Sequence, residues 1–259
     1  MLIENIIITT ILYAPRIFMA FIIIPIFSVR MFSSILIRNS FIVLILICYV
    51  TSGKSIIDPV MLFDIGGYIV VLIAKEIVIG FSIGICFAVL FWSIDSVGQL
   101  IDTMRGSTLA SIFNPLLNES TSITGTVLYY FVSVIFVAFG GINTLLSTVY
   151  ESYNIFDVLS LDFRNVDYHK FMLIIWDSFL DLFVGFSMPF IILFTLCDLS
   201  LGFANRTSPQ LNAFSLSLPI KSTISVFLLA IVIYFYPERI LTYLHSDFLI
   251  LKSTFGKIL

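Results

Sequence analysis

Long apolar runs separated by short polar segments organise the chain. Residues 77–94 and 123–150 contain no charged side chain, and each run is long enough to cross ~30 Å of hydrocarbon as a helix. The segment between them is too polar for lipid and too apolar for an ordinary solvent loop. Because a loop at membrane depth is tolerated only where protein or water-filled space surrounds it, the pattern predicts two helices joined by a re-entrant, plug-like loop.

Four further apolar runs extend this pattern. They cover residues 6–27, 41–50, 171–201 and 211–236, and the run before the central segment begins at residue 65. We therefore expect an all-α, polytopic membrane protein in which about six runs form helical hairpins. A single membrane domain is predicted over residues 1–259, with 237–259 as a mixed, amphipathic tail. Gly80 and Gly84 form a GxxxG pattern, which favours close contact between helices.

Composition agrees with a membrane protein and narrows the partners. Hydrophobic residues make up 59% of the chain and charged residues 11%, whereas soluble domains have about 25% charged residues. The net charge of −3 provides no basic stripe to neutralise phosphates, so we expect no nucleic-acid partner. The three cysteines are odd in number and lie in apolar runs, which indicates reduced thiols. No basic region precedes the first run, so no cleavable signal peptide is expected.

Several charged side chains lie inside the apolar runs. They are Arg16, Lys75, Glu76, Asp181, Asp198 and Lys221. Facing lipid, each would cost ~2.5–3.5 kcal/mol on insertion scales, on the order of 15 kcal/mol together. They must therefore pair, reach the membrane surface, or face protein and water. We expect partner subunits to satisfy several of them.

The end of the run before the central loop carries Asp95, Gly98, Asp102 and Arg105, spaced three, four and three apart. If the helix continues to this point, the four share one face, and Asp102 and Arg105 are placed to pair. One interpretation is a solvated helix end with a local salt bridge. The other is a polar wall that leads to the loop, in which Asp95 and Asp102 line a path.

Residues 106–122 carry only one charged side chain, Glu119. Neutral hydroxyl and amide side chains alternate there with leucine, isoleucine and phenylalanine. Such a surface can touch many peptide sequences without gripping one, or it can pack as a plug. Asn118, Ser120 and Thr121 are also good caps for the next helix, and that duty explains some of them by itself.

A second polar break lies between the last two long runs. Arg206 is a lone cation there, and it either donates to carbonyl groups of the central loop or lies near lipid headgroups. Pro209 blocks helix continuation, while Gln210 and Asn212 can satisfy the backbone groups that are freed.

The sequence gives little support for a catalytic site or a metal site. Asp177 and Asp181 lie four apart without a third polar group, which is too little for an acid/base site. His169 and His245 are isolated and lack metal-ligand spacing. We expect a non-enzymatic protein with no cofactor and no metal.

A set of short motifs, in fixed order from Arg16 to Lys221, resembles the SpaR/FliR/SctT family, the T subunits of the type III secretion export apparatus. The motifs are Lys75-Glu76 with Gly80, Asp102-x-x-Arg105-Gly106-x-Thr108, Gly140-Gly141, Tyr150-Glu151-Ser152-Tyr153, Asp198-x-x-x-Gly202, and Arg206-x-x-Pro209-Gln210-x-Asn212-x-Phe214 with Pro219 and Lys221. The Arg-Gly-x-Thr loop combined with the Arg206 segment is highly specific, whereas the glycine pair alone is not. The residues around Tyr150 and Phe113-Asn114 are closer to the virulence injectisome branch than to the flagellar one.

The resemblance implies a closed, hetero-oligomeric helical assembly in the bacterial inner membrane, raised toward the periplasm. One T subunit joins R and S subunits and contacts other export-apparatus and basal-body components, membrane lipid and unfolded secreted proteins. It also implies site residues in three groups. The plug or gate loop comprises Arg105, Gly106, Ser107, Thr108, Leu109, Ile112, Phe113, Asn114, Pro115, Asn118 and Glu119. The segment that contacts the gate comprises Arg206, Pro209, Gln210 and Asn212. The third group, which lines a polar path or lies at a subunit interface, comprises Asp95, Asp102, Lys75, Glu76, Asp198 and Lys221.

The sequence therefore predicts a core subunit of a protein-export gate, with pore and plug elements that unfolded substrates pass. Two alternatives belong to other classes. A small-molecule secondary transporter would explain Asp181, Asp198 and Lys221, although no internal two-fold repeat is visible. A purely structural membrane scaffold would not touch substrate.

Overall fold

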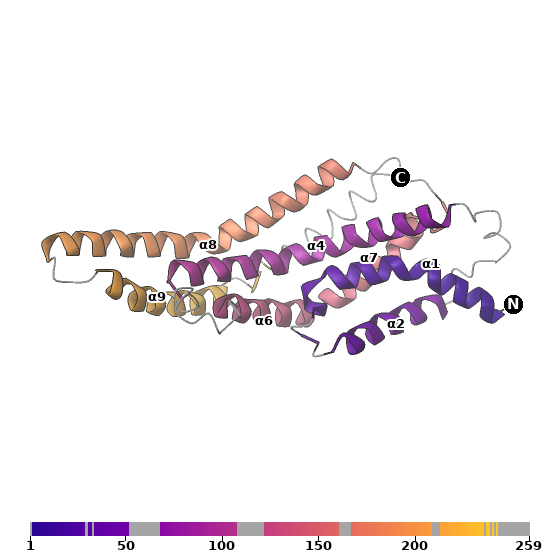
Figure 1. The fold of residues 1–259 in the computed structure, drawn as a ribbon, viewed down its shortest axis with the longest axis horizontal. Helices are drawn as coiled ribbons and strands as arrows, with labels where there is room; N and C mark the ends of the chain where they lie inside the picture. The colour runs from indigo at the N-terminus through magenta and orange to yellow at the C-terminus, as the bar shows by residue number, and fades with distance from the viewer. Residues whose placement is uncertain are drawn as a thin grey trace. The chain divides into compact units, whose positions relative to one another are not determined.

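The structure is a computed structural model that describes residues 2–28, 31–32, 34–51, 68–107, 122–160, 167–208, 213–235, 237–238, 240 and 242. Within these residues every regular element is helical (Figure 1). The elements are α1 (Leu2–Ile23), η1 (Pro25–Phe27), α2 (Ile35–Thr51), α4 (Ile69–Met104), α6 (Ile123–Ala138), α7 (Gly141–Ile155), α8 (Tyr168–Thr207) and α9 (Ala213–Phe235). The predicted all-α fold is confirmed.

Three of these helices are long and apolar enough to cross a membrane, namely α4, α8 and residues 215–235 of α9. The pair α6 and α7 counts as a further, broken span, and two shorter apolar helices cover residues 7–23 and 35–51. These six segments correspond to the six runs in the sequence. The prediction of a polytopic helical membrane protein is therefore confirmed in its class.

The structure differs from the expected run boundaries at two places. The uncharged run 123–150 is two helices, because Gly140 takes a left-handed conformation (φ 78°) between them. That conformation is open to glycine at little cost. The polar residues 205–207 belong to α8, which passes Pro189 and ends at Thr207. Continuing the helix satisfies the backbone groups of these residues by hydrogen bonds within α8.

The chain divides into two compact units. One comprises residues 1–89, 140–175 and 244–259, and the other comprises 90–139 and 176–243. The single domain expected over residues 1–259 stays a prediction.

In the first unit α1 lies beside α2 and also contacts α7 (Figure 1). Its buried side includes Ile17, Ala20 and Phe21, each fully inaccessible to solvent. The first part of α4 approaches α1 at glycine positions: a Cβ on Gly80 would collide with the backbone oxygen of Arg16, and one on Gly84 would lie 2.9 Å from that of Ala20. The close contact predicted from the GxxxG pattern is confirmed.

In the second unit the end of α4 packs on the start of α6. A Cβ on Gly98 would collide with the backbone of Gly125, so two glycines allow the two backbones to touch. The buried side of α9 is unusually polar for an apolar helix, since it carries Ser217, Lys221 and Ser225 before Leu228 and Val232. These contacts bring charged side chains close to the end of α4.

Candidate functional site

The central segment is framed by a well-defined helix end and a well-defined helix start. At the end of α4, Gly106 adopts φ 76°, and its N–H donates to the carbonyl of Thr103 at 3.1 Å. The N–H of Ser107 donates to the carbonyl of Asp102, also at 3.1 Å. This pair of bonds is the Schellman arrangement that satisfies the last carbonyls of a helix. At the start of α6, the Ser122 hydroxyl accepts from the N–H of Gly125 at 2.8 Å, as an N-cap does.

Asp102 joins these two helix ends. Its Oδ1 pairs with a guanidinium nitrogen of Arg105 at 2.7 Å and accepts a short hydrogen bond from the Thr124 hydroxyl. Its Oδ2 accepts from the Ser122 hydroxyl at 2.7 Å and from the N–H of Thr124 at 3.0 Å. The predicted Asp102–Arg105 pair is confirmed. Asp102 itself is not solvated, however, because it is only 3% exposed.

Two neighbouring groups complete the surroundings of this junction. The Nε atom of Arg105 is buried and has no hydrogen-bond partner among the described residues. Asp95, two turns before Asp102 on α4, is half-buried and accepts from the side-chain amide of Gln99 at 3.0 Å. In the described contacts, the Asp102 side chain therefore joins the end of α4 to the start of α6.

Lys221 of α9 reaches the same end of α4. Its ammonium donates to the carbonyl of Met104 at 3.3 Å and pairs with Oδ2 of Asp198, on α8, at 2.7 Å. The Lys221 side chain is 9% exposed and that of Asp198 is 51% exposed. A cation near the last carbonyls of a helix is favourable, so Lys221 links α8 and α9 to the end of α4.

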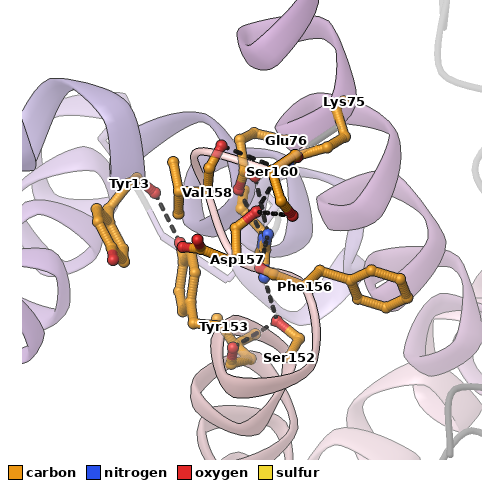
Figure 2. Close-up of polar contacts among 11 residues, drawn as sticks. Tyr13, Lys75, Glu76, Ser152, Tyr153, Phe156, Asp157, Val158 and Ser160 are labelled. Carbon is orange, nitrogen blue, oxygen red and sulfur yellow. Dashed lines mark hydrogen bonds and ion pairs between the residues drawn. The ribbon is translucent and has the colours of Figure 1, made fainter. Parts of the chain in front are cut away.

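A second cluster of charges lies in the other unit (Figure 2). Arg16 of α1 is fully buried and forms two hydrogen bonds with the carboxylate of Glu76 on α4, at 2.7 and 2.8 Å. The same guanidinium donates to the hydroxyl of Ser152 at 3.0 Å and to the carbonyl of Phe156 at 3.1 Å. It also lies 4.1 Å from the ring centroid of Tyr153. Bidentate pairing with a carboxylate is among the strongest hydrogen-bonding arrangements of an arginine side chain.

Lys75 extends this cluster to the segment that follows α7. Its ammonium donates to the carbonyls of Asp157, Val158 and Ser160 at 2.6, 3.1 and 2.9 Å, as Figure 2 shows. It lies 3.2 Å from the carboxylate of Glu76. Two cations thus share one carboxylate, and Lys75 in addition satisfies three backbone carbonyls beyond the end of α7.

Tyrosine rings pack against one side of this cluster. Tyr153 donates its hydroxyl to the carbonyl of Tyr13 at 2.7 Å, and its ring centroid is 4.7 Å from that of Tyr13 and 4.9 Å from that of Tyr49. Tyr49 in turn stacks on Tyr150 at 4.8 Å. The rings give the buried charges a packed, low-dielectric wall.

Most of the charges inside the apolar runs have a partner within this chain. Arg16, Lys75 and Glu76 bond to one another and to nearby backbone and hydroxyl groups, so these three do not need the neighbouring subunit that we expected. Asp198 and Lys221 also pair within the chain. Asp177 and Asp181 are exposed on α8. Within the described residues, no group of three or more histidine, cysteine, aspartate or glutamate side chains is arranged to hold a metal ion.

The structure describes part of the predicted gate. Arg105, Gly106 and Ser107 lie at the end of α4, and Arg206 lies exposed in the last turn of α8. The remaining predicted gate residues lie outside the described residues; they are Thr108, Leu109, Ile112, Phe113, Asn114, Pro115, Asn118, Glu119, Pro209, Gln210 and Asn212.

Some contacts of the predicted site residues were not predicted. The roles of Ser122 and Thr124 as donors to Asp102 were missed, although a serine directly before an apolar run is a typical cap signal. The link between Arg16 and Glu76, 60 residues apart, has no local signal in the sequence.

Long apolar helices whose buried charges pair within the chain define a multi-pass helical membrane protein. The sequence model of the family described as bacterial export proteins, family 1, matches residues 7–246. The chain belongs to this family, and the resemblance found in the motifs is confirmed.

Individual relatives agree with this assignment. The chain is 39% identical over 160 residues to the secretion system apparatus protein SsaT of Salmonella typhimurium, which covers 62% of this chain and 62% of SsaT. It is 32% identical over 236 residues to the Yop proteins translocation protein T of Yersinia pestis, covering 89% of this chain and 87% of that protein. It is 28% identical over 182 residues to the flagellar biosynthetic protein FliR of Bacillus subtilis, covering 68% and 69%.

Proposed function

We propose that the chain is a non-enzymatic core subunit of a type III protein-export gate in the bacterial inner membrane. Unfolded substrate proteins pass a gate that is partly built from residues 105–122 and Arg206. Family membership supports export as the function. The identities to SsaT (39%) and to the Yop proteins translocation protein T (32%) exceed the identity to FliR of Bacillus subtilis (28%), which supports the virulence injectisome branch.

The observation that carries the gate assignment is the junction at Asp102. The residues on both sides of the segment 108–121 bond to Asp102: Ser107 donates its N–H to the Asp102 backbone carbonyl, and Ser122 donates its hydroxyl to the buried carboxylate. Fixed flanks are what a seal needs, because a plug must return to the same place after each substrate. In our proposal Arg206, exposed in the last turn of α8, supplies a cation for the opposite side of the gate.

The partners follow from the apolar surface. Large hydrophobic side chains are exposed on α8 and α9, including Phe203 (70%), Phe227 (70%) and Tyr234 (78%). Such surfaces are covered by lipid or by other apolar helices. In our proposal the R and S subunits cover much of this surface in a helical assembly with a single T copy, raised toward the periplasm. Other export-apparatus and basal-body components surround that assembly.

The test is the permeability of the membrane to ions. Residues 112–118 are deleted in the complete export complex, and a second variant replaces the same residues by glycine and serine without changing the length. We expect both variants to leak, the deletion more than the replacement, with the complex still assembled. A membrane that stays as tight as wild type in both variants would show that this segment does not seal the channel.

The transporter alternative relied on intramembrane charges that would bind a solute. Asp198 and Lys221 pair with each other at 2.7 Å, which leaves neither charge without a partner. Purification in mild detergent separates the two proposals. An export-gate subunit isolates together with two other small membrane proteins, whereas a transporter isolates alone or as a homo-oligomer. Substrate crosslinking to residues 106–122 separates a gate from a scaffold.

A further inference from the structure

We infer that Asp102 is a positioning residue that sets the spacing between the end of α4 and the start of α6, and thereby how tightly the gate closes. The first half of this inference concerns the described helices alone. The second half rests on the proposed function. Nothing in the family assignment names a residue for this task.

The bonds of the carboxylate show why the junction depends on Asp102. Its Oδ1 accepts from Arg105 and from the Thr124 hydroxyl, and its Oδ2 accepts from the Ser122 hydroxyl and the Thr124 N–H. Both oxygens therefore take part, and three of the four donor groups belong to the start of α6. With 3% of the residue exposed, water cannot replace a lost partner, and an unsatisfied buried group is costly.

The position of Asp102 relative to the two helices adds a directional argument. A negative charge is favourable at the N-terminus of α6 and unfavourable at the C-terminus of α4, where the carbonyls point. Arg105 at 2.7 Å and Lys221, which donates to the Met104 carbonyl at 3.3 Å, offset the unfavourable end. The carboxylate therefore interacts favourably with the N-terminus of α6, while the two cations reduce its repulsion from the carbonyl groups at the end of α4.

Asparagine is the informative replacement, because it keeps the shape and removes one acceptor. If its amide nitrogen takes the place of Oδ1, it faces the guanidinium of Arg105. If it takes the place of Oδ2, it faces the N–H of Thr124. Hydroxyl groups can rotate to accept, but a guanidinium and a backbone N–H cannot. Either orientation of Asp102→Asn therefore leaves one donor unsatisfied.

The first measurement is the separation of the two helix ends in the complete export complex. Cys48, Cys86 and Cys197 are replaced by alanine, and Ser107→Cys and Ile123→Cys provide two new thiols. Ser107 is exposed and Ile123 is 69% exposed, and neither side chain bonds to the Asp102 carboxylate. Bismaleimides of increasing length then report the distance between the thiols through the yield of crosslinked protein.

We expect Asp102→Asn to lower the yield with the shortest reagent by about tenfold, which corresponds to one lost hydrogen bond to a charged group. Thr124→Val, which removes one hydroxyl donor and keeps the carboxylate, should lower it less. Asp177→Asn, the same chemical change at an exposed position of α8, should leave it unchanged. If Asp102→Asn fails to accumulate, Thr124→Val decides. A yield that stays at the wild-type level in the variants that do accumulate overturns the inference.

The second measurement is the ion leak of the same complexes. Asp102→Asn should leak like a partial form of the 112–118 deletion, and closing the two thiols with the short reagent should restore a tight membrane. A merely structural role would not be rescued by a tether between the helix ends. If the deletion leaks and Asp102→Asn does not, the inference fails and the proposed gate stands. If the deletion does not leak, the proposed function fails, and the crosslinking yields still decide the role of Asp102.

Discussion

Replacement of Arg16 by methionine tests the role of the buried charge cluster. Arg16 is fully buried and donates two hydrogen bonds to Glu76, one to Ser152 and one to the carbonyl of Phe156. Arg16→Met removes all four bonds and leaves the Glu76 carboxylate, in a residue 1% exposed, with Lys75 at 3.2 Å as its remaining ionic partner.

The magnitude follows from that geometry. Breaking a buried ion pair by removing one partner costs ~3–5 kcal/mol, because the other charge stays buried. Lys75 compensates part of the Glu76 charge, so we expect the lower part of this range, ~3–4 kcal/mol. For a chain of this size 1 kcal/mol shifts the melting temperature by roughly 2–4 °C. The expected loss is therefore ~6–16 °C.

The assay is thermal denaturation of the solubilised protein for Arg16→Met, Glu76→Met and the double variant. Replacing both partners removes the isolated charge, so the double variant should be less destabilised than either single one. The four proteins form a double-mutant cycle that isolates the pairwise term. If the double variant loses as much stability as the two single variants added together, the two side chains do not act as a pair and the reasoning is wrong.

Three further predictions use single positions. Gly80→Ala places a Cβ against the backbone of Arg16 and should cost ~1–3 kcal/mol in thermal denaturation. Gly202→Ala on α8, with open space around the Cβ, is the matched control and should be neutral or slightly stabilising. Lys75→Met removes the donor to three carbonyls of residues 157–160 and should speed limited proteolysis there by about tenfold; an unchanged rate would contradict this. Gly140→Ala forces alanine to φ 78° and should cost ~1–2 kcal/mol, whereas Gly140→Asn should cost less; equal melting temperatures for both variants would contradict the conformational reason.

Local patterns predicted the helices well and their boundaries less well. Apolar runs and the GxxxG pair indicated the helices and one of their contacts. The break at Gly140 was not predicted, because a glycine pair in an apolar run is compatible with a continuous helix. The Asp102–Arg105 pair was predictable because residues three apart on a helix are neighbours. Its other partners, Ser122 and Thr124, lie beyond a segment of the chain whose path the sequence alone does not define.

The sequence by itself determined that this protein is a helical membrane protein of the export family, since hydropathy is a property of each stretch of residues and the motifs are local. Only the tertiary structure decided which charged groups pair. Arg16 pairs with Glu76, 60 residues away, and Lys75 donates to carbonyls more than 80 residues away in the sequence. Burial makes an unpaired charge so unfavourable that it must find a partner, but the identity of that partner depends on which helices pack together. That choice comes from the shape of the packed helices, which no single stretch of residues contains.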